Sequence, residues 1–156
     1  MILHLNWGKS LLLKDASADN AIYSLDLSHV PDRAGIYIFG RRHGSTFEAL
    51  YVGKATKIRG RIRVHFNNLK LMQHLRTAKS GKRILLTGVF ERKQAQNVAK
   101  SLRIAEQALI RHFLAEGHDL VNKAGTRIRR HEIVSDGNHP KRYFPKSVFA
   151  EKGRGE

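Results

Sequence analysis

The sequence predicts a mixed α+β domain with a small, mainly antiparallel sheet of three strands flanked by helices. Two apolar runs, residues 35–40 and 49–53, lie on either side of a turn-rich stretch, which indicates a hairpin of buried strands. Helical periodicity follows, then a third apolar run, then a long amphipathic stretch. Hairpin strands are antiparallel and no phosphate-binding glycine motif is present, so the sequence argues against a doubly wound nucleotide-binding fold.

The elements are predicted in order from local patterns. Alternating apolar residues over 3–7 and 23–27 predict two short strands before the hairpin, and residues 41–48 predict a long hairpin loop. The later patterns predict a helix over 57–66, a helix over 69–79, a strand over 83–92 after Gly81, and a helix over 94–116 that stops at Gly117.

The length of 156 residues predicts a single domain with one core. Within it we expect a strand-rich N-terminal addition at 1–32, a core at 33–122 and a basic C-terminal extension at 123–156. The chain has no cysteine, which excludes disulfides, thiolate nucleophiles and Cys-ligated metal sites. The apolar runs are strand-sized, so we expect no membrane span and a cytoplasmic location, nucleoid-associated when the protein is bound to DNA.

The charge is strongly basic and unevenly distributed. Lys and Arg number 29 against 13 Asp and Glu, a net charge of +16, and no acid occurs between Glu48 and Glu91. Such a field collects polyanions, of which nucleic acid is the commonest, although an acidic membrane surface or acidic protein stays open. The predicted nucleic-acid-binding residues are Lys57, Arg59, Arg63, Lys70, Lys141 and Arg142.

Glu106 stands out in the long amphipathic stretch. At about 100° per residue its carboxylate falls within the apolar stripe of that helix. A buried carboxylate must be neutral, paired with a cation or bound to a metal. The alternative is a slightly rotated helix on which Glu106 pairs with Arg103 at the edge.

Several other residues carry both a structural and a functional interpretation. Tyr37 and Tyr51 lie inside apolar strands, where tyrosines commonly only pack. Arg61 and His65 share a helix face that binds phosphate or is merely solvated. Asn122 follows the long helix, where a turn or capping role is usual.

The aromatic residues of the C-terminal extension and the histidines also allow more than one interpretation. Tyr143, Phe144 and Phe149 alternate with basic residues and either stack on bases or pack onto the domain. The nine histidines show no HExxH motif, so no zinc site is assigned. The histidines at positions 43, 112, 118, 131 and 139 are expected at the surface.

In chain order, these residues resemble the motifs of the GIY-YIG nuclease family. The matching positions are GIY at 35–37, YVG at 51–53, Lys54, Arg61, His65, Glu106 and Asn122. The string ALYVGKATKIRGRIRVHF is similar to the nuclease module of the bacterial excinuclease that acts in nucleotide excision repair. YVG in place of YIG is a mild departure, and His65, where the excision-repair members have tyrosine, is more like restriction-type members.

The resemblance implies divalent-metal-dependent hydrolysis of a DNA phosphodiester, in repair or in restriction. It implies that Glu106 holds one Mg²⁺ or Mn²⁺, which keeps several waters, and that Arg61 braces the phosphoryl oxygens. Tyr37 is expected to be the general base and Tyr51 to orient the water or phosphate, with the reverse assignment open. His65 would relay the proton or bind phosphate, and Lys54 would help to lower the tyrosine pKa.

The alternative from a different class is a non-catalytic, basic nucleic-acid-binding module on the same fold. The residues Tyr37, Tyr51, Arg61 and Glu106 favour the enzyme, since a module that only bound DNA has no need of a carboxylate facing the phosphates. DNA is the expected partner, with no small-molecule cofactor. The sequence leaves the DNA form, the cleavage specificity and the oligomeric state open.

Overall fold

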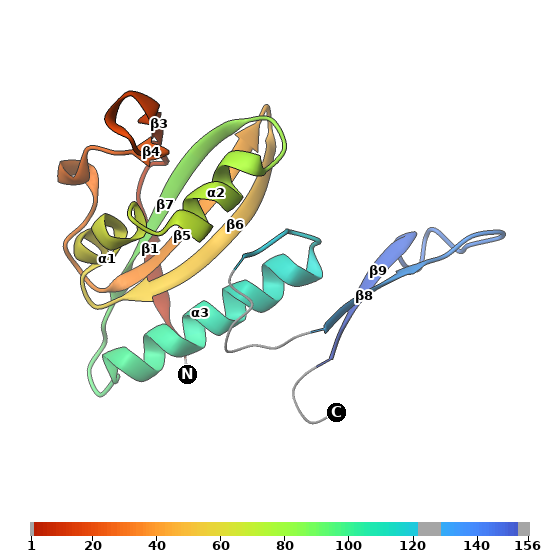
Figure 1. Ribbon diagram of the computed structural model, residues 1–156. Coiled ribbons are helices and arrows are strands. Elements are labelled where there is room, and N and C mark those ends of the chain that lie inside the picture. The colour runs from red at the N-terminus through yellow and green to blue at the C-terminus, as the bar shows by residue number, and fades with distance from the viewer. Residues whose placement is uncertain (1, 122–128, 153–156) are drawn as a thin grey trace.

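The structure is a computed structural model that describes residues 2–121 and 129–152. Its centre is an antiparallel sheet in the order β1-β7-β5-β6, with β2 also paired to β7 (Figure 1). The strands are β1 (His4–Trp7), β2 (Leu11–Leu12), β5 (Gly35–His43), β6 (Thr46–Ala55) and β7 (Lys82–Glu91). The predicted α+β class and the three predicted core strands, β5, β6 and β7, are confirmed.

Helices cover both faces of the sheet (Figure 1). The helices α1 (Ile58–His65) and α2 (Leu69–Thr77) pack with Tyr37 and Phe39 on one face. Helix α3 (Val98–Ala115) packs with Ile36 and Ile38 on the other. Because successive side chains of a strand point to opposite faces, the buried part of β5, residues 35–40, must be apolar at every position, which explains its continuous run.

The N-terminal segment extends the sheet from three strands to five. β1 pairs with residues 88–91 of β7, and β2 pairs with residues 84–85 of the same strand. A small second hairpin joins β3 (Lys14–Asp15) to β4 (Tyr23–Ser24), after which Leu27–His29 form a 3-10 turn. Val30 is fully buried in the cluster under α1 and α2. This segment is therefore part of the core packing.

The prediction of a long loop at 41–48 is wrong. Strand pairing continues to His43 and resumes at Thr46, so only a two-residue turn remains. Gly44 in that turn has φ +59°, a conformation that glycine adopts without strain. The polar residues that suggested a loop pair across the hairpin, where the Arg41 Nε donates to the Glu48 Oε1 at 2.8 Å.

The long helix begins later than predicted. α3 starts at Val98, four residues beyond the expected start, because the Asn97 side chain caps it by accepting from the Lys100 N–H. Ala95 just before has φ +66°, which is incompatible with a helix.

The C-terminal extension contains regular structure where no periodic pattern predicted it. β8 (Arg129–Val134) and β9 (Ser147–Lys152) pair antiparallel as a hairpin of their own. In Figure 1 this hairpin projects away from the sheet and its helices. None of the helices in the described ranges 2–121 and 129–152 is long and apolar enough to cross a membrane.

Candidate active site

The β5–β6 hairpin places two tyrosine rings together. Tyr37 lies opposite Gly53 in the register, and its ring passes over that glycine. A Cβ at Gly53 would come within 2.3 Å of the Tyr37 Cζ, so only glycine fits beneath the ring. The rings of Tyr37 and Tyr51 stack, with centroids 6.2 Å apart and planes 17° from parallel. The glycine of the YVG motif therefore makes room for the tyrosine of the preceding strand.

Helix α1 brings a histidine against this pair. Ile58 and Ile62 anchor α1 on the sheet, and His65, one turn further along, is only 3% exposed. The Tyr37 hydroxyl and the His65 Nε2 form a hydrogen bond of 2.6 Å, and the His65 ring lies 5.0 Å from that of Tyr51. Burial, together with the charge of Arg61, lowers the pKa of His65 to about 4. His65 is therefore neutral at physiological pH.

The two tyrosines differ in environment. Tyr37 is 1% exposed, and burial raises its pKa well above the ordinary tyrosine value, with a further rise from Tyr51 and a smaller opposing effect of Arg61. Tyr51 is only partly buried. Burial also raises the pKa of Tyr51, but a hydrogen bond from Tyr37 and the charge of Arg61 oppose this rise. Tyr51 is thus the tyrosine whose anion has both a hydroxyl and a guanidinium to stabilise it.

Glu106 lies on α3, which packs on the face of the sheet opposite to α1, and its side chain contacts β6. Its side chain is 19% exposed, and its Oε2 lies 3.4 Å from the Nζ of Lys54 on β6. The carboxylate is therefore half-buried at the edge of the core, where the sequence predicted burial in the apolar stripe. Its ion-pair partner is Lys54, and Arg103, the partner in the alternative interpretation, is exposed. The charge of Glu106 also raises the pKa of Tyr51, which shows that the two groups are electrostatically coupled.

A solvent-open hollow adjoins these groups between the end of β6 and the start of α1. A Cβ at Gly60 would meet no atom within 4 Å, so the helix surface there is unobstructed. The hollow is lined by Lys54, Ala55, Thr56, Lys57, Gly60, Arg61 and Val64. Three cations around an open hollow provide a surface that suits a phosphate backbone.

Glu106 is the residue beside the hollow that could hold a hard divalent ion. No group of three or more His, Asp or Glu that could hold a metal occurs in the part of the chain that the structure describes. A single carboxylate suits Mg²⁺ or Mn²⁺, because these ions retain several waters and take further oxygens from a bound phosphate. The half-buried position of Glu106 beside the hollow agrees with such a role.

Of the seven predicted catalytic residues, the structure brings together Tyr37, Tyr51, Lys54, Arg61, His65 and Glu106. The seventh, Asn122, lies outside the described residues. The last described residue before it, Val121, donates its N–H to the Leu50 carbonyl next to Tyr51.

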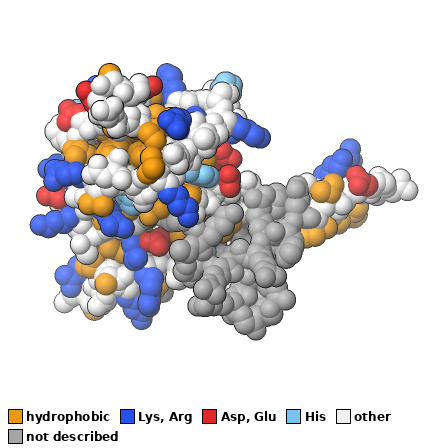
Figure 2. Space-filling view, in the orientation of Figure 1, with side chains coloured by type: hydrophobic (Ala, Val, Ile, Leu, Met, Phe, Trp, Pro, Cys, Tyr) orange, Lys and Arg blue, Asp and Glu red, His pale blue; other side chains and the backbone are white. Residues whose placement is uncertain are grey.

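The predicted nucleic-acid-binding residues are mostly exposed. Lys and Arg side chains are scattered over the body of the molecule, with a few acidic ones between them (Figure 2). Arg59 differs from the others because it is partly buried, and its Nε donates to the Val30 carbonyl at 2.9 Å. The exposed members of the set are Lys57, Arg63, Lys70, Lys141 and Arg142.

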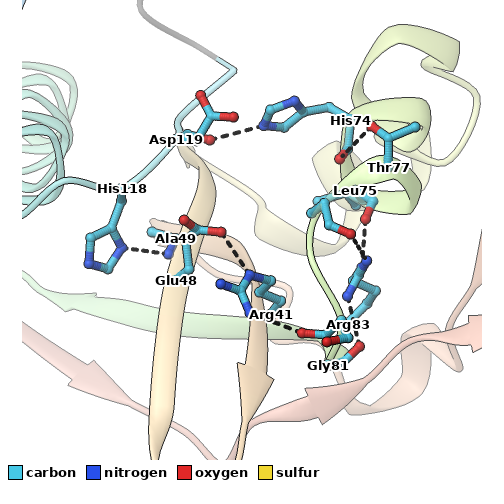
Figure 3. A network of polar contacts seen from close by, with 12 residues as sticks. Arg41, Glu48, Ala49, His74, Leu75, Thr77, Gly81, Arg83, His118 and Asp119 are labelled. Atoms are coloured by element: carbon cyan, nitrogen blue, oxygen red, sulfur yellow. Dashed lines mark hydrogen bonds and ion pairs between the residues drawn. The ribbon is translucent and has the colours of Figure 1, made fainter.

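Sequence reasoning missed a polar network that holds the segment after α3 (Figure 3). The Ala49 N–H on β6 donates to the His118 Nδ1 at 2.7 Å, and the His74 Nε2 contacts the Asp119 carbonyl at 3.0 Å. His118 is half-buried, and so is His139 in the C-terminal extension, so the expected place of both at the surface is wrong. The neighbour of His118, Gly117, which ends the helix at φ +95°, was the available signal that the chain turns back onto the sheet here.

Arg83 lies in the acid-free stretch between Glu48 and Glu91, but it has an internal role (Figure 3). It is 9% exposed and donates to the carbonyls of Leu75, Gly81 and Ala78. It therefore caps the C-terminus of α2, where the unpaired carbonyls of a helix favour a cation.

The comparison with protein families agrees with this geometry. The family model described as the GIY-YIG catalytic domain matches residues 33–119, more than half of the chain. No curated protein and no solved structure is significantly similar to the chain. The match begins just before β5 and ends just after α3, so it includes every described residue of the site. The chain belongs to the GIY-YIG nuclease superfamily.

Proposed function

We propose that this protein is a divalent-metal-dependent endonuclease that hydrolyses phosphodiester bonds in DNA. The observation that carries the proposal is the convergence of a coupled Tyr37–His65–Tyr51 group with the half-buried Glu106 beside a basic hollow. These side chains come from β5, α1, β6 and α3, so four elements of the core contribute to the site. Family membership supports nuclease activity in general.

We assign the general base to Tyr51, which is the second of the two assignments that the sequence left open. In this assignment neutral His65 carries its proton on Nε2 and donates to the Tyr37 oxygen, and Tyr37 donates to the Tyr51 oxygen. The 2.6 Å contact between the Tyr37 hydroxyl and the His65 Nε2 is compatible with that tautomer. Because both hydrogen bonds point toward Tyr51, a negative charge is stabilised best on the Tyr51 oxygen. Tyr51 acts in its deprotonated form, after its own proton has passed to solvent on the exposed side of the ring. The phenolate oxygen then takes a proton from the attacking water, which reaches it from that side.

The cations of the hollow handle the phosphate. Arg61 presents a planar fork of donors that can brace two phosphoryl oxygens, a geometry that lysine does not provide. Lys54 balances the charge of Glu106 and borders the same hollow. Glu106 would hold the divalent ion, which supplies charge stabilisation for the phosphoryl group and the leaving oxygen when bound.

A second function is favoured by one observation, the Lys54–Glu106 ion pair. This pair satisfies the carboxylate without any metal, as expected of a basic module that binds nucleic acid without cleaving it. The two functions make opposite predictions about turnover and the same prediction about binding.

Incubation with single-stranded, duplex, nicked and flap DNA distinguishes the endonuclease from the binding module. With Mg²⁺ or Mn²⁺ we expect cleavage of at least one substrate, and with EDTA we expect none. Binding in EDTA, measured in parallel by electrophoretic mobility shift, serves as the control. Tight binding with no cleavage under any metal would support the binding module and contradict the endonuclease.

A further inference from the structure

The segment between β8 and β9, residues 135–146, forms a folded loop that the proposed catalytic chemistry does not use. Its ends are joined by the Ser135 N–H, which donates to the Lys146 carbonyl at 2.8 Å. Lys146 also pairs with Asp136, with 3.7 Å between the Nζ and Oδ1 atoms. Within the loop the Tyr143 N–H donates to the Pro140 carbonyl at 2.9 Å. We call this segment the β8–β9 loop.

Two adjacent aromatic residues in the β8–β9 loop have different environments. Phe144 packs against His139, with ring centroids 4.9 Å apart and planes 60° from parallel. Tyr143 is 85% exposed, the most exposed large hydrophobic side chain in the described part of the molecule. The loop therefore uses one aromatic ring to hold its shape and presents the other to solvent.

The charge around Tyr143 identifies the kind of partner. Lys141 and Arg142 immediately precede it and are both exposed. The acid of the loop, Asp136, pairs with Lys146 and lies away from Tyr143 in the sequence. A flat aromatic ring flanked by cations suits a base with its neighbouring phosphates.

We propose that the β8–β9 loop is a second nucleic-acid contact, in which Tyr143 stacks on an unpaired base while Lys141 and Arg142 contact the flanking phosphates. The proposal rests on the proposed function and names its substrate class, DNA with unpaired bases. In a duplex, both faces of each base are covered by its neighbours in the stack. A base in a flap, bulge or single strand offers a free face to the ring.

Metal-free binding tests the proposal without requiring turnover. The full chain in EDTA is titrated by fluorescence anisotropy into two oligonucleotides of equal length, one a plain duplex and one with an unpaired stretch. We expect Tyr143→Ala and Tyr143→Leu to weaken binding to the unpaired substrate by about 5- to 150-fold, the range for loss of one stacked base. Tyr143→Phe keeps the ring and should bind like the wild type.

Val134→Ala is the matched control, because it removes another exposed apolar side chain, 51% exposed, from the same hairpin. It should leave both affinities unchanged. The ring-removing variants should change duplex binding little, because stacking has no free base there. A fluorescent 2-aminopurine in the unpaired stretch should be quenched by the wild type and by Tyr143→Phe, and not by Tyr143→Leu.

Equal losses on duplex and unpaired DNA, or no loss with Tyr143→Ala, would overturn the proposal. Sedimentation that showed a dimer dissociated by Tyr143→Ala would also overturn it, because the ring would then contact a second copy. If Tyr143 governs binding but no DNA is cleaved with metal, the proposed endonuclease fails and this inference stands. If cleavage occurs and Tyr143→Ala binds normally, the proposed endonuclease stands and this inference fails.

Discussion

At the scale of single residues, the two stacked tyrosine rings of the site differ in how far solvent can reach them. Tyr37 is enclosed by the hairpin and α1, whereas Tyr51 is partly open. The Tyr37 hydroxyl bonds to the His65 Nε2, so its removal leaves a buried nitrogen without that partner. In the proposed mechanism, Tyr37 therefore contributes to stability as well as to the chemistry, and Tyr51 mainly to the chemistry.

Replacing each tyrosine by phenylalanine separates these contributions. Tyr51→Phe should lower the single-turnover cleavage rate by about 10²- to 10⁴-fold, the usual cost of losing a general base. Tyr37→Phe should lower the free energy of unfolding by about 1–3 kcal/mol, through the unpaired His65 nitrogen. If Tyr51→Phe cleaves at the wild-type rate and Tyr37→Phe does not, the two roles are reversed.

The lowered pKa of His65 gives a stability that depends on pH. Neutral His65 is favoured in the folded state, while the unfolded chain takes up the proton near pH 6.5. The contribution of His65 is therefore complete above pH 6.5 and is lost as the pH falls toward 4. From pH 7 to 4.5 this loss should reach about 2–3 kcal/mol.

The measurement is urea unfolding of the wild type and His65→Gln at both pH values. Glutamine cannot titrate but can still hydrogen-bond to Tyr37, so the variant should show a smaller loss of stability on acidification. Parallel pH dependences in the two proteins would contradict a buried, neutral His65.

At the scale of elements, the basic residues on and next to α1 are of two kinds, one held by a hydrogen bond within the protein and the others exposed to solvent. Ile58, Ile62 and His65 face the sheet, and Arg59 is tied to the Val30 carbonyl of the N-terminal segment. Lys57 and Arg63 are exposed. The sequence placed all three basic residues in one nucleic-acid-binding set, because spacing along a helix does not show which cation meets a carbonyl from a distant segment.

This separation predicts different effects for neighbouring substitutions. Reversal of the charges at Lys57 and Arg63 should weaken DNA binding and reduce the log-log salt slope by about 2, since each phosphate contact contributes about 0.9. The cleavage rate at saturating DNA should stay near the wild-type value. The matched variant Arg59→Ala should instead lower the free energy of unfolding by about 1 kcal/mol through the lost hydrogen bond. An unchanged salt slope in the Lys57 and Arg63 variant would exclude them as phosphate contacts.

Helix and strand boundaries show where local patterns fail. The strands of the β5–β6 hairpin were predictable from their apolar runs, but their outer ends were not, because cross-strand pairs such as Arg41–Glu48 look like loop residues in sequence. The start of α3 depends on the Asn97 cap and on the backbone of Ala95. Such boundaries depend on particular contacts and dihedral angles, so a hydrophobic period cannot locate them.

At the scale of the whole molecule, the sequence predicted which side chains meet in the candidate site. It did not predict how the N-terminal strands attach to the sheet. The convergence of Tyr37, Tyr51, His65 and Glu106 could be expected because their motifs resemble those of a known family. Pairing of β1 and β2 with β7 could not, since such short strands carry little pattern of their own. The Lys54–Glu106 pair likewise required the packing of α3 against β6.

The central claim, that Glu106 holds the ion needed for cleavage, is tested most directly by Glu106→Gln. The variant keeps the shape of the side chain and removes its charge, and Glu116→Gln on the exposed end of α3 is the matched control. Metal-dependent cleavage, thermal stability and metal-free DNA affinity are measured on the same preparations. We expect cleavage by Glu106→Gln at background, stability within about 1 kcal/mol of the wild type and an equal or higher DNA affinity. A Glu106→Gln protein that still cleaves DNA in response to Mg²⁺ would contradict the account.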